Sequence, residues 1–167
     1  MAHRVLVLGA GLVARPLVRY LLDREGFEVT VATRTVKKAE AIVAGHPRGR
    51  AVAVDVTSKE AMRPLVEKAD LAVSLVPYAH HVQVAELCLE RKIDMVTTSY
   101  VSPPMRALDA RAREAGIIIL NECGLDPGID HMSAMRVIHA VKTAGGKVTE
   151  FRSICSGLPT PKTNTNP

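Results

Sequence analysis

The chain has 167 residues, of which 47% are hydrophobic and 23% charged, values that fit one globular domain with a sizeable core. Its net charge of +5 comes from scattered Lys and Arg residues, and its aromatic content is only 3% with no Trp, which excludes a nucleic-acid-binding protein that stacks bases on aromatic platforms. The three cysteines are far apart, which argues against a disulfide framework, and no apolar run reaches the roughly 18 residues of a membrane span. The first strand begins almost at Met1, which leaves no room for a signal peptide, so we expect a cytoplasmic protein.

The first predicted elements are a buried strand and a glycine-spaced turn. Residues 5–8 form a continuous apolar run, which is typical of a parallel strand buried on both faces. Gly9 allows a tight turn, Gly11 lets the backbone approach a pyrophosphate, and Ala14 permits close packing of a helix predicted over residues 12–23. The phosphates would lie at the N-terminus of that helix. A tight turn without a ligand is the alternative, but the strand, the helix and the N-terminal position together favour a dinucleotide.

The end of the second predicted strand, residues 27–33, indicates which dinucleotide binds. Arg34 lies about 20 residues beyond the glycine motif, where NAD-specific sites place Asp or Glu on the ribose 2′-hydroxyl and where Arg accommodates a 2′-phosphate. Thr33 and Thr35 flank this residue. An Arg that merely caps an exposed strand end is the other interpretation. Because no acid occupies the position, we predict NADP rather than NAD. Two further cations follow closely, Lys37 and Lys38.

The third strand is predicted over residues 51–56, and Asp55 lies at its end. An Asp at this position can accept a hydrogen bond from the adenine amino group of the cofactor. The alternative is that Asp55 caps the next helix, although Thr57 or Ser58 would cap it equally well. We therefore predict an adenine contact.

The fourth strand, residues 71–75, leads into backbone at residues 75–77. In a doubly wound sheet the ends of the first and fourth strands flank the point where the dinucleotide lies, so this backbone should approach the nicotinamide half. His80 and His81 open the next helix. Neighbouring helical residues point in different directions and no third ligand is evident, so we predict no metal site.

The remaining elements continue the alternation of strand and helix. A strand is predicted at residues 94–98, a helix at 103–115 and a strand at 117–120. This order predicts an α/β fold, a doubly wound parallel sheet of the Rossmann type. Residues 129–143 predict another helix, and residues 147–155 alternate apolar and polar side chains, as in a strand with one covered face.

These patterns divide the chain into three parts. Residues 1–128 form the NAD(P)-binding domain, residues 129–155 a helix and a strand leading onwards, and residues 156–167 a Pro-, Thr- and Asn-rich flexible tail. The last predicted strand has no partner inside the chain. An exposed strand edge favours pairing with another chain, so we expect a homodimer.

Several runs spread over the whole chain carry a more specific signal than the glycine motif. They lie at residues 5–14, 75–78, 98–100, 124–131 and 157–159, and the most specific is Gly-Leu-Asp-Pro-Gly-Ile-Asp-His at 124–131. In these runs the chain resembles the saccharopine dehydrogenase (saccharopine reductase) family, and Thr33-Arg34-Thr35 is similar to the NADP-dependent, glutamate-forming branch of that family. The resemblance implies oxidation of the secondary amine of saccharopine to glutamate and 2-aminoadipate 6-semialdehyde, or the reverse, in lysine metabolism. It also implies a second, α+β substrate domain that begins near the end of this chain and is truncated here.

The resemblance also assigns site residues by position. For the cofactor they are Gly9, Ala10, Gly11, Leu12, Val13 and Ala14 on the pyrophosphate; Thr33, Arg34 and Thr35 on the 2′-phosphate; Asp55 and Val56 on the adenine; and Leu75, Val76, Pro77 and Thr98 on the nicotinamide side, with Leu125 and Asp126 completing the set. For the substrate they are Ser99, Tyr100, Asp126 and Cys155. Two residues depart from the family pattern, Cys123 in place of an aliphatic residue and Ser156 in place of a glycine.

The implied chemistry needs the nicotinamide held near the substrate carbon and a group that takes a proton from the amine. Asp126, on its Pro-Gly turn, can bind the substrate ammonium or relay its proton, or it can simply shape the turn. Tyr100 is the weaker acid–base candidate, because an unperturbed tyrosine has a pKa of about 10. Cys155 is equally compatible with a small buried hydrophobe, and His131 with a local helix-start bond. A dinucleotide-binding module without catalysis and a carboxynorspermidine-type dehydrogenase stand as alternative functions.

Overall fold

A computed structural model of the chain describes residues 2–155, and in this part six strands form one parallel sheet. The strand order is β3-β2-β1-β4-β5-β6, the order of the dinucleotide-binding fold, which confirms the predicted doubly wound architecture. The strands are β1 (His3–Leu8), β2 (Phe27–Thr33), β3 (Gly49–Ala53), β4 (Leu71–Ser74), β5 (Asp94–Thr97) and β6 (Ile119–Leu120). The helices are α1 (Ala14–Leu22), α2 (Val36–Val43), α3 (Lys59–Val66), the 3-10 turn η1 (Tyr78–His80), α4 (His81–Arg91), α5 (Pro103–Arg106), α6 (Asp109–Ala115) and α7 (Ile129–Thr143).

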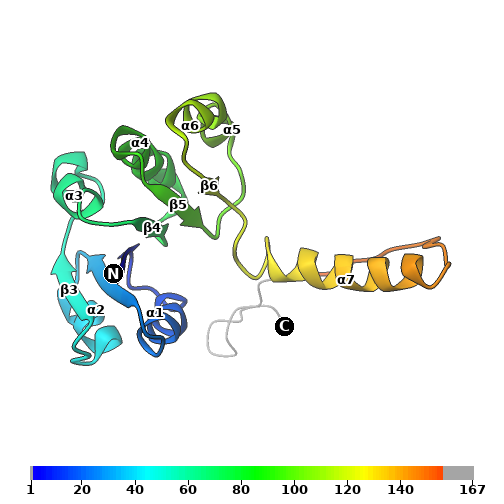
Figure 1. Cartoon of the computed structure of the whole chain (residues 1–167), viewed down its shortest axis with the longest axis horizontal. Helices are drawn as coiled ribbons and strands as arrows, with labels where there is room; N and C mark the ends of the chain where they lie inside the picture. The colour runs from blue at the N-terminus through cyan, green and yellow to red at the C-terminus, as the bar shows by residue number, and fades with distance from the viewer. Residues whose placement is uncertain (1, 156–167) are drawn as a thin grey trace, which may run out of the picture.

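The central strand β1 is buried on both faces, as its apolar run predicts. Successive side chains of a strand point to opposite faces, so Val5 and Val7 enter one core with α1 and α2. Leu6 and Leu8 enter the other core with α3, α4 and the α5–α6 pair. The helices therefore cover both faces of the sheet (Figure 1). This double burial fixes β1 and the turn that follows it at the middle of the fold.

The helix predicted at residues 103–115 is two helices. Ser102 begins α5, because its hydroxyl accepts from the backbone N of Met105 at 3.2 Å. The backbone N of Leu108 then donates to the carbonyl of Met105, three residues earlier, which is a tighter turn than an α-helix makes. Leu108 is buried in the core at this break. The chain thus changes direction between α5 and α6.

Residues 129–143 form α7 as predicted, but this helix projects away from the sheet (Figure 1). None of its residues is buried, and its apolar side chains Met132, Met135 and Val137 are exposed. The strand predicted at residues 147–155 is not formed, and Ile154 there is 93% exposed. A strand needs a neighbour for its backbone hydrogen bonds, and alternation of side chains alone does not supply one. The predicted tail, residues 156–167, lies outside the described residues.

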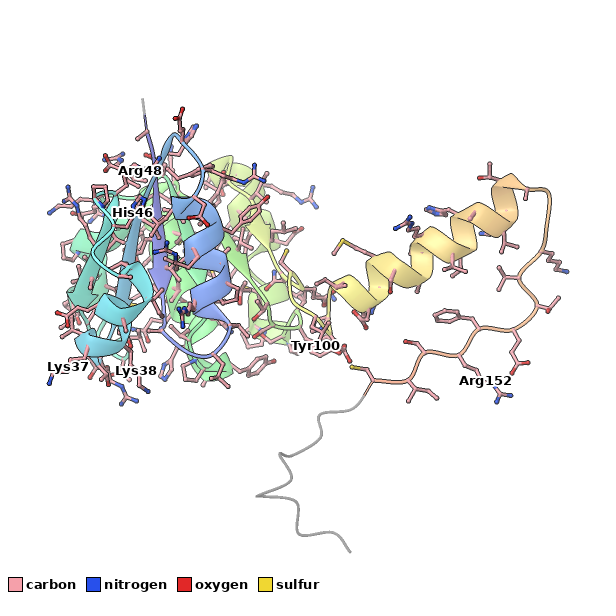
Figure 2. All side chains as sticks on the ribbon, turned by 90° about the horizontal axis from the view of Figure 1, so that it is seen from below. Lys37, Lys38, His46, Arg48, Tyr100 and Arg152 are labelled. Carbon is pink, nitrogen blue, oxygen red and sulfur yellow. The ribbon has the colours of Figure 1, made fainter. Side chains whose placement is uncertain are left out.

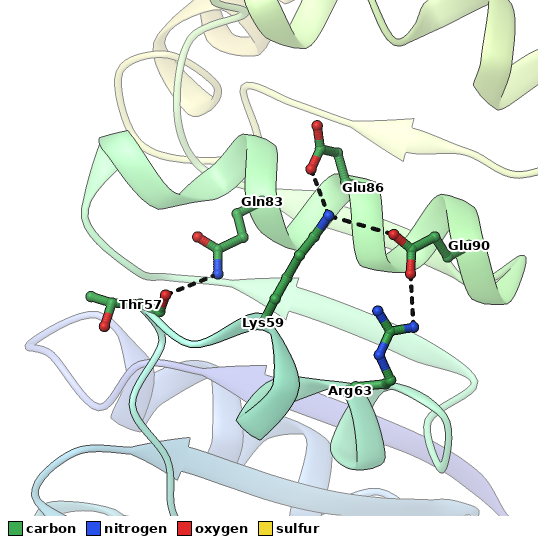
Figure 3. A network of polar contacts seen from close by, with 6 residues as sticks. All are labelled: Thr57, Lys59, Arg63, Gln83, Glu86 and Glu90. Carbon is green, nitrogen blue, oxygen red and sulfur yellow. Dashed lines mark hydrogen bonds and ion pairs between the residues drawn. The ribbon is translucent and has the colours of Figure 1, made fainter.

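An ion-pair network ties α3 to α4 (Figure 3). Lys59 Nζ lies 2.8 Å from Glu86 and 3.4 Å from Glu90, and Arg63 lies 2.8 Å from the other oxygen of Glu90. These side chains are each about one-third exposed, so the network fixes the mutual position of the two helices more than it adds stability, with about 1 kcal/mol or less per pair.

Arg48 closes the far end of α1. Its guanidinium donates to the carbonyls of Leu22 at 2.7 Å and Arg24 at 2.8 Å, so a positive charge meets the negative end of the helix dipole. Figure 2 shows Arg48 near the amino ends of the strands and Lys37 and Tyr100 near their carboxyl ends. The N-terminus of α1 also lies at the carboxyl ends of the strands, because α1 follows β1 directly after the glycine turn. Of the helices described here, none combines the length and apolar character needed to cross a membrane.

Candidate functional site

The turn after β1 has the geometry of a phosphate-binding loop. Gly9 has a φ of +110°, and a Cβ there would stand 2.6 Å from the carbonyl oxygen of Leu75, so only glycine fits. At Gly11, by contrast, nothing lies within 4 Å of the Cβ position. Ala14 is fully buried and begins α1, and its N-cap residue Val13 places no side-chain bond on the first turn. An uncapped helix N-terminus beside open space fits a pyrophosphate.

The other residues of the predicted pyrophosphate site form the rim of this turn. Ala10 packs against the core that α1 and α2 form with one face of the sheet, while Leu12 and Val13 are exposed. Because Leu12 and Val13 have neither charge nor hydrogen-bond donors in their side chains, the backbone N–H groups of the turn are left to bind the phosphates.

The carboxyl end of β2 carries the residues predicted for the 2′-phosphate. Thr33 is half-buried, and Arg34 and Thr35 are exposed. Thr35 is the N-cap of α2 but makes no side-chain capping bond. Lys37, in the first turn of α2, lies at the same edge (Figure 2). This end of the sheet is therefore cationic and exposed, as a 2′-phosphate site requires.

Asp55 makes a local turn instead of capping a helix. Its Oδ1 accepts from the backbone N of Thr57 at 3.0 Å and from the Thr57 hydroxyl at 2.8 Å, while Ser58 caps α3. These bonds, and to a smaller degree the charge of Arg34, lower the pKa of Asp55. This turn ends the hydrogen bonding of β3 to β2, so β3 ends at Ala53 and not at residue 56 as predicted. Val56 is 9% exposed and packs in the core, which leaves its backbone for a cofactor contact.

The residues predicted for the nicotinamide side lie together beside β1. The backbone N of Leu75 donates to the last carbonyl of β1 at 2.8 Å, Val76 is buried and Pro77 is exposed. Thr98 follows β5 and is half-buried. A Cβ on Gly124 would lie 3.2 Å from the Cβ of Thr98, so the loop that follows β6 packs directly against the end of β5.

Three of the residues predicted for the substrate are brought together at this edge. The Tyr100 hydroxyl donates to Asp126 Oδ1 at 2.5 Å, and the neighbouring Asp126 carboxylate raises the pKa of the Cys155 thiol. The bond to Asp126, followed by burial, raises the pKa of Tyr100 to about 12. Tyr100 therefore stays protonated at neutral pH and donates to the carboxylate, and its acid–base role stays a prediction. Leu125, beside them, is exposed.

The loop that carries Asp126 is held by glycine and by the start of α7. A Cβ on Gly128, whose φ is +147°, would overlap the carbonyl oxygen of Gly124. Asp130 Oδ1 accepts from the backbone N of Gly128 at 2.9 Å and pairs with His131 Nδ1 at 2.7 Å, which raises the pKa of His131. Asp126, Asp130 and His131 bring oxygen and nitrogen atoms within 4.8 Å of one another, but these bonds already explain the cluster as a helix start.

One buried residue of the site escaped the sequence reasoning. His81, at the first position of α4, bonds Ser74 through Nδ1 at 2.9 Å and Ser99 through Nε2 at 2.8 Å. Ser99, predicted to contact substrate, is thus already engaged by a side chain. A signal was present, because Ser74 and Thr97 are polar residues that follow apolar residues at the ends of β4 and β5, and a buried polar group needs a partner.

Comparison with known proteins agrees with this geometry. Residues 5–120 match the family described as saccharopine dehydrogenase NADP binding domain. The chain belongs to this family. Residues 124–167 match the family described as saccharopine dehydrogenase C-terminal domain. The prediction of NADP rather than NAD is therefore confirmed at the level of the family.

Three relatives illustrate the match. Saccharopine dehydrogenase (NADP(+), L-glutamate-forming) of Schizosaccharomyces pombe is 44% identical over 98% of this chain and 36% of its own length. Carboxyaminopropylagmatine dehydrogenase of Synechocystis is 29% identical over 75% of this chain and 35% of its own length. The solved structure of apo saccharopine dehydrogenase (L-Glu forming) from Saccharomyces cerevisiae aligns with a TM-score of 0.78 at 40% identity, covering 86% of this chain and 32% of that one. The saccharopine dehydrogenase-like chain thus spans about a third of these relatives.

Proposed function

We propose that this chain binds NADP(H) along the carboxyl edge of its sheet. The observation that carries the proposal is the uncapped N-terminus of α1 beside the open space at Gly11, combined with the cationic end of β2 at Arg34. The pyrophosphate would lie on the former and the 2′-phosphate on the latter, with Asp55 at the adenine. Membership of an NADP-binding family supports this arrangement.

Titration with NADPH and NADH tests the cofactor site. We expect the wild-type chain to bind NADPH more tightly than NADH. The Arg34→Ala variant should weaken NADPH binding by about ten- to a hundredfold, the range for losing a hydrogen bond to a charged group, and leave NADH binding unchanged. Arg113→Ala, an exposed arginine on α6, is the matched control. Equal NADPH affinity in the Arg34 and Arg113 variants would contradict the assignment.

We propose further that the chain is the cofactor-binding part of an oxidoreductase that acts on the secondary amine of saccharopine. NADP, when bound, accepts or supplies the hydride. Asp126 would bind the ammonium of the substrate and take its proton, while Tyr100 holds that carboxylate in place. In this division residues 1–128 form the cofactor domain and residues 129–155 lead into the substrate domain.

Saccharopine-dependent formation of NADPH tests this chemistry. Because the chain spans about a third of its relatives, we expect NADPH binding with weak turnover or none. Turnover that is lost in Asp126→Asn would support a catalytic role for this carboxylate within the chain. Robust turnover would exclude a dinucleotide-binding module without catalysis, and a chain that does not bind the cofactor would contradict both functions. Competition between saccharopine and carboxyaminopropyl amines separates the saccharopine reaction from the carboxynorspermidine-type alternative, which the cyanobacterial relative favours.

We also propose an oligomeric state and a cellular location for this chain. A homodimer is supported by the exposed apolar side chains of α7, among them Met132 and Val137, although the strand edge first invoked for it is not formed. A monomer in light scattering would exclude it. A cytoplasmic location is supported by three free cysteines, two of them exposed.

A further inference from the structure

His81 is the most enclosed ionisable residue near the candidate site. It is 4% exposed and stands at the start of α4, facing the sheet. Besides the bonds to Ser74 at 2.9 Å and Ser99 at 2.8 Å, its ring nitrogens lie 3.3 and 3.4 Å from the hydroxyl of Thr97. The ring therefore meets hydroxyl groups from two neighbouring strands and from the loop beyond one of them.

The partners of this ring are placed where the strands end. Ser74 is the last residue of β4 and directly precedes Leu75, and Thr97 is the last residue of β5 and directly precedes Thr98. Ser74 and Thr97 are fully buried, whereas Ser99 is half-buried at the edge of the site. One imidazole thus joins the two segments on which the nicotinamide half of the cofactor would rest.

The imidazole also sets the direction of the hydroxyl bonds. Burial lowers the pKa of His81, so the ring is neutral at physiological pH, with one nitrogen donating and the other accepting. A serine hydroxyl can rotate either to donate or to accept a hydrogen bond. The protonation of the ring nitrogens therefore decides whether the Ser99 hydroxyl donates to His81 or accepts from it and can donate to a ligand in the site. The backbone of Ser99 is bonded separately: its carbonyl accepts from the backbone N of Glu122 at 3.1 Å, and its N donates to the Thr97 hydroxyl oxygen at 3.5 Å.

We propose that His81 is a positioning residue for the nicotinamide side of the site. It acts through Ser99, whose hydroxyl it holds at the border of the site, and it does not touch the cofactor. This inference rests on the proposed NADP(H) site. It predicts that changes at His81 affect ligands that reach the nicotinamide side and spare ligands that occupy only the adenosine side.

Two substitutions separate the bonds of the ring. The amide of His81→Gln ends as far from the backbone as Nε2 and can keep the bond to Ser99. The amide of His81→Asn ends as far as Nδ1 and can keep only the bond to Ser74. Both variants and the wild-type 167-residue chain are titrated with NADPH, which reaches the nicotinamide side, and with 2′,5′-ADP, which does not. Far-ultraviolet circular dichroism and thermal unfolding establish that each variant is folded.

We expect His81→Asn to bind NADPH about five- to tenfold more weakly than wild type, the change that loss of one hydrogen bond gives, and to bind 2′,5′-ADP within about twofold. His81→Gln should bind both probes within about twofold of wild type. Unchanged NADPH binding in folded His81→Asn, or an equal loss of both probes, would overturn the inference, since the second result indicates a merely structural role. Wild-type chain that binds neither probe would instead overturn the proposed cofactor site itself.

A measurement on the wild-type chain decides the matter should the asparagine variant not fold. In protein labelled with nitrogen-15, the ring nitrogens of His81 should change chemical shift on addition of NADP⁺ and stay unchanged with 2′,5′-ADP. Absence of a shift with NADP⁺, in a chain that binds it, would overturn the inference.

Discussion

Gly9 lies so close to the backbone just after β4 that any side chain there should destabilise the fold. In Gly9→Ala the new methyl would stand 2.6 Å from the oxygen and 2.9 Å from the carbon of the Leu75 carbonyl, and the residue would keep a φ of +110°. The backbone strain costs about 1–3 kcal/mol. Crowding against backbone, which cannot rotate away, adds about 1–3 kcal/mol. We expect the free energy of unfolding to fall by about 2–6 kcal/mol, a large share of the about 5–15 kcal/mol of an ordinary domain.

Urea denaturation followed by circular dichroism measures this loss, and Gly11→Ala is its matched control. No atom lies within 4 Å of the Cβ position at Gly11, so we expect the stability to change by about 0.5 kcal/mol or less. The same methyl would occupy the space assigned to the pyrophosphate, and NADPH binding should weaken by about tenfold or more. A Gly9→Ala variant as stable as wild type would refute the steric reasoning, and a Gly11→Ala variant with full affinity would refute the placement of the phosphates.

Three further predictions concern stability. Arg48→Ala removes two charged hydrogen bonds from the end of α1 and should lower the free energy of unfolding by about 1–2 kcal/mol in urea denaturation. The Arg4 guanidinium holds the pKa of Asp70 at about 2, so this exposed pair contributes about 1 kcal/mol or less above about pH 4. The contribution is lost as the pH falls through about 2, and Asp70→Asn should match wild type below that pH. Lys59→Met should lower stability by about 1 kcal/mol or less at low salt, with a smaller loss in about 1 M NaCl.

Each of these predictions has its own control or contrary result. Arg50→Ala, an exposed neighbour on β3, should leave stability unchanged where Arg48→Ala does not. For Asp70 the sign is decisive, because a depressed carboxyl pKa stabilises the fold above the unfolded value and loses that contribution as pH falls. A difference between wild type and Asp70→Asn that grows below pH 4 contradicts the assignment. For Lys59, a loss that salt does not reduce points to packing of its aliphatic stem instead.

The sequence predicts best where local pattern and burial agree. The apolar run of β1 is buried on both faces, and the alternation of strands and helices yields the observed strand order. The bounds of α7 also follow from its pattern. The failure at residues 147–155 has the opposite cause, since alternation describes which side chains share a face and not whether a neighbour exists. Phe151 and Ile154 moreover stand three residues apart, so they would point to opposite faces of a strand, and both are exposed.

Long-range contacts account for what sequence reasoning missed in the site. His81 meets Ser99, eighteen residues further along the chain, only because β4 and β5 are neighbours in the sheet. The raised pKa of Tyr100 likewise depends on Asp126, which arrives from the loop after β6. The family resemblance pointed to Tyr100 and Asp126, but the hydrogen bond between them required the fold.

The exposure of α7 has a consequence for how the chain opens. A 15-residue helix that buries none of its side chains gains little from tertiary packing, and isolated helices of about this length are marginal in water. Its amide protons should therefore exchange with solvent by local opening, while those of β1 and α4 exchange only when the sheet unfolds. The boundary between these two cooperative units falls at Gly128, two residues after Asp126. The carboxylate proposed to handle the substrate proton thus lies at the junction between the sheet and a helix that we expect to open without it.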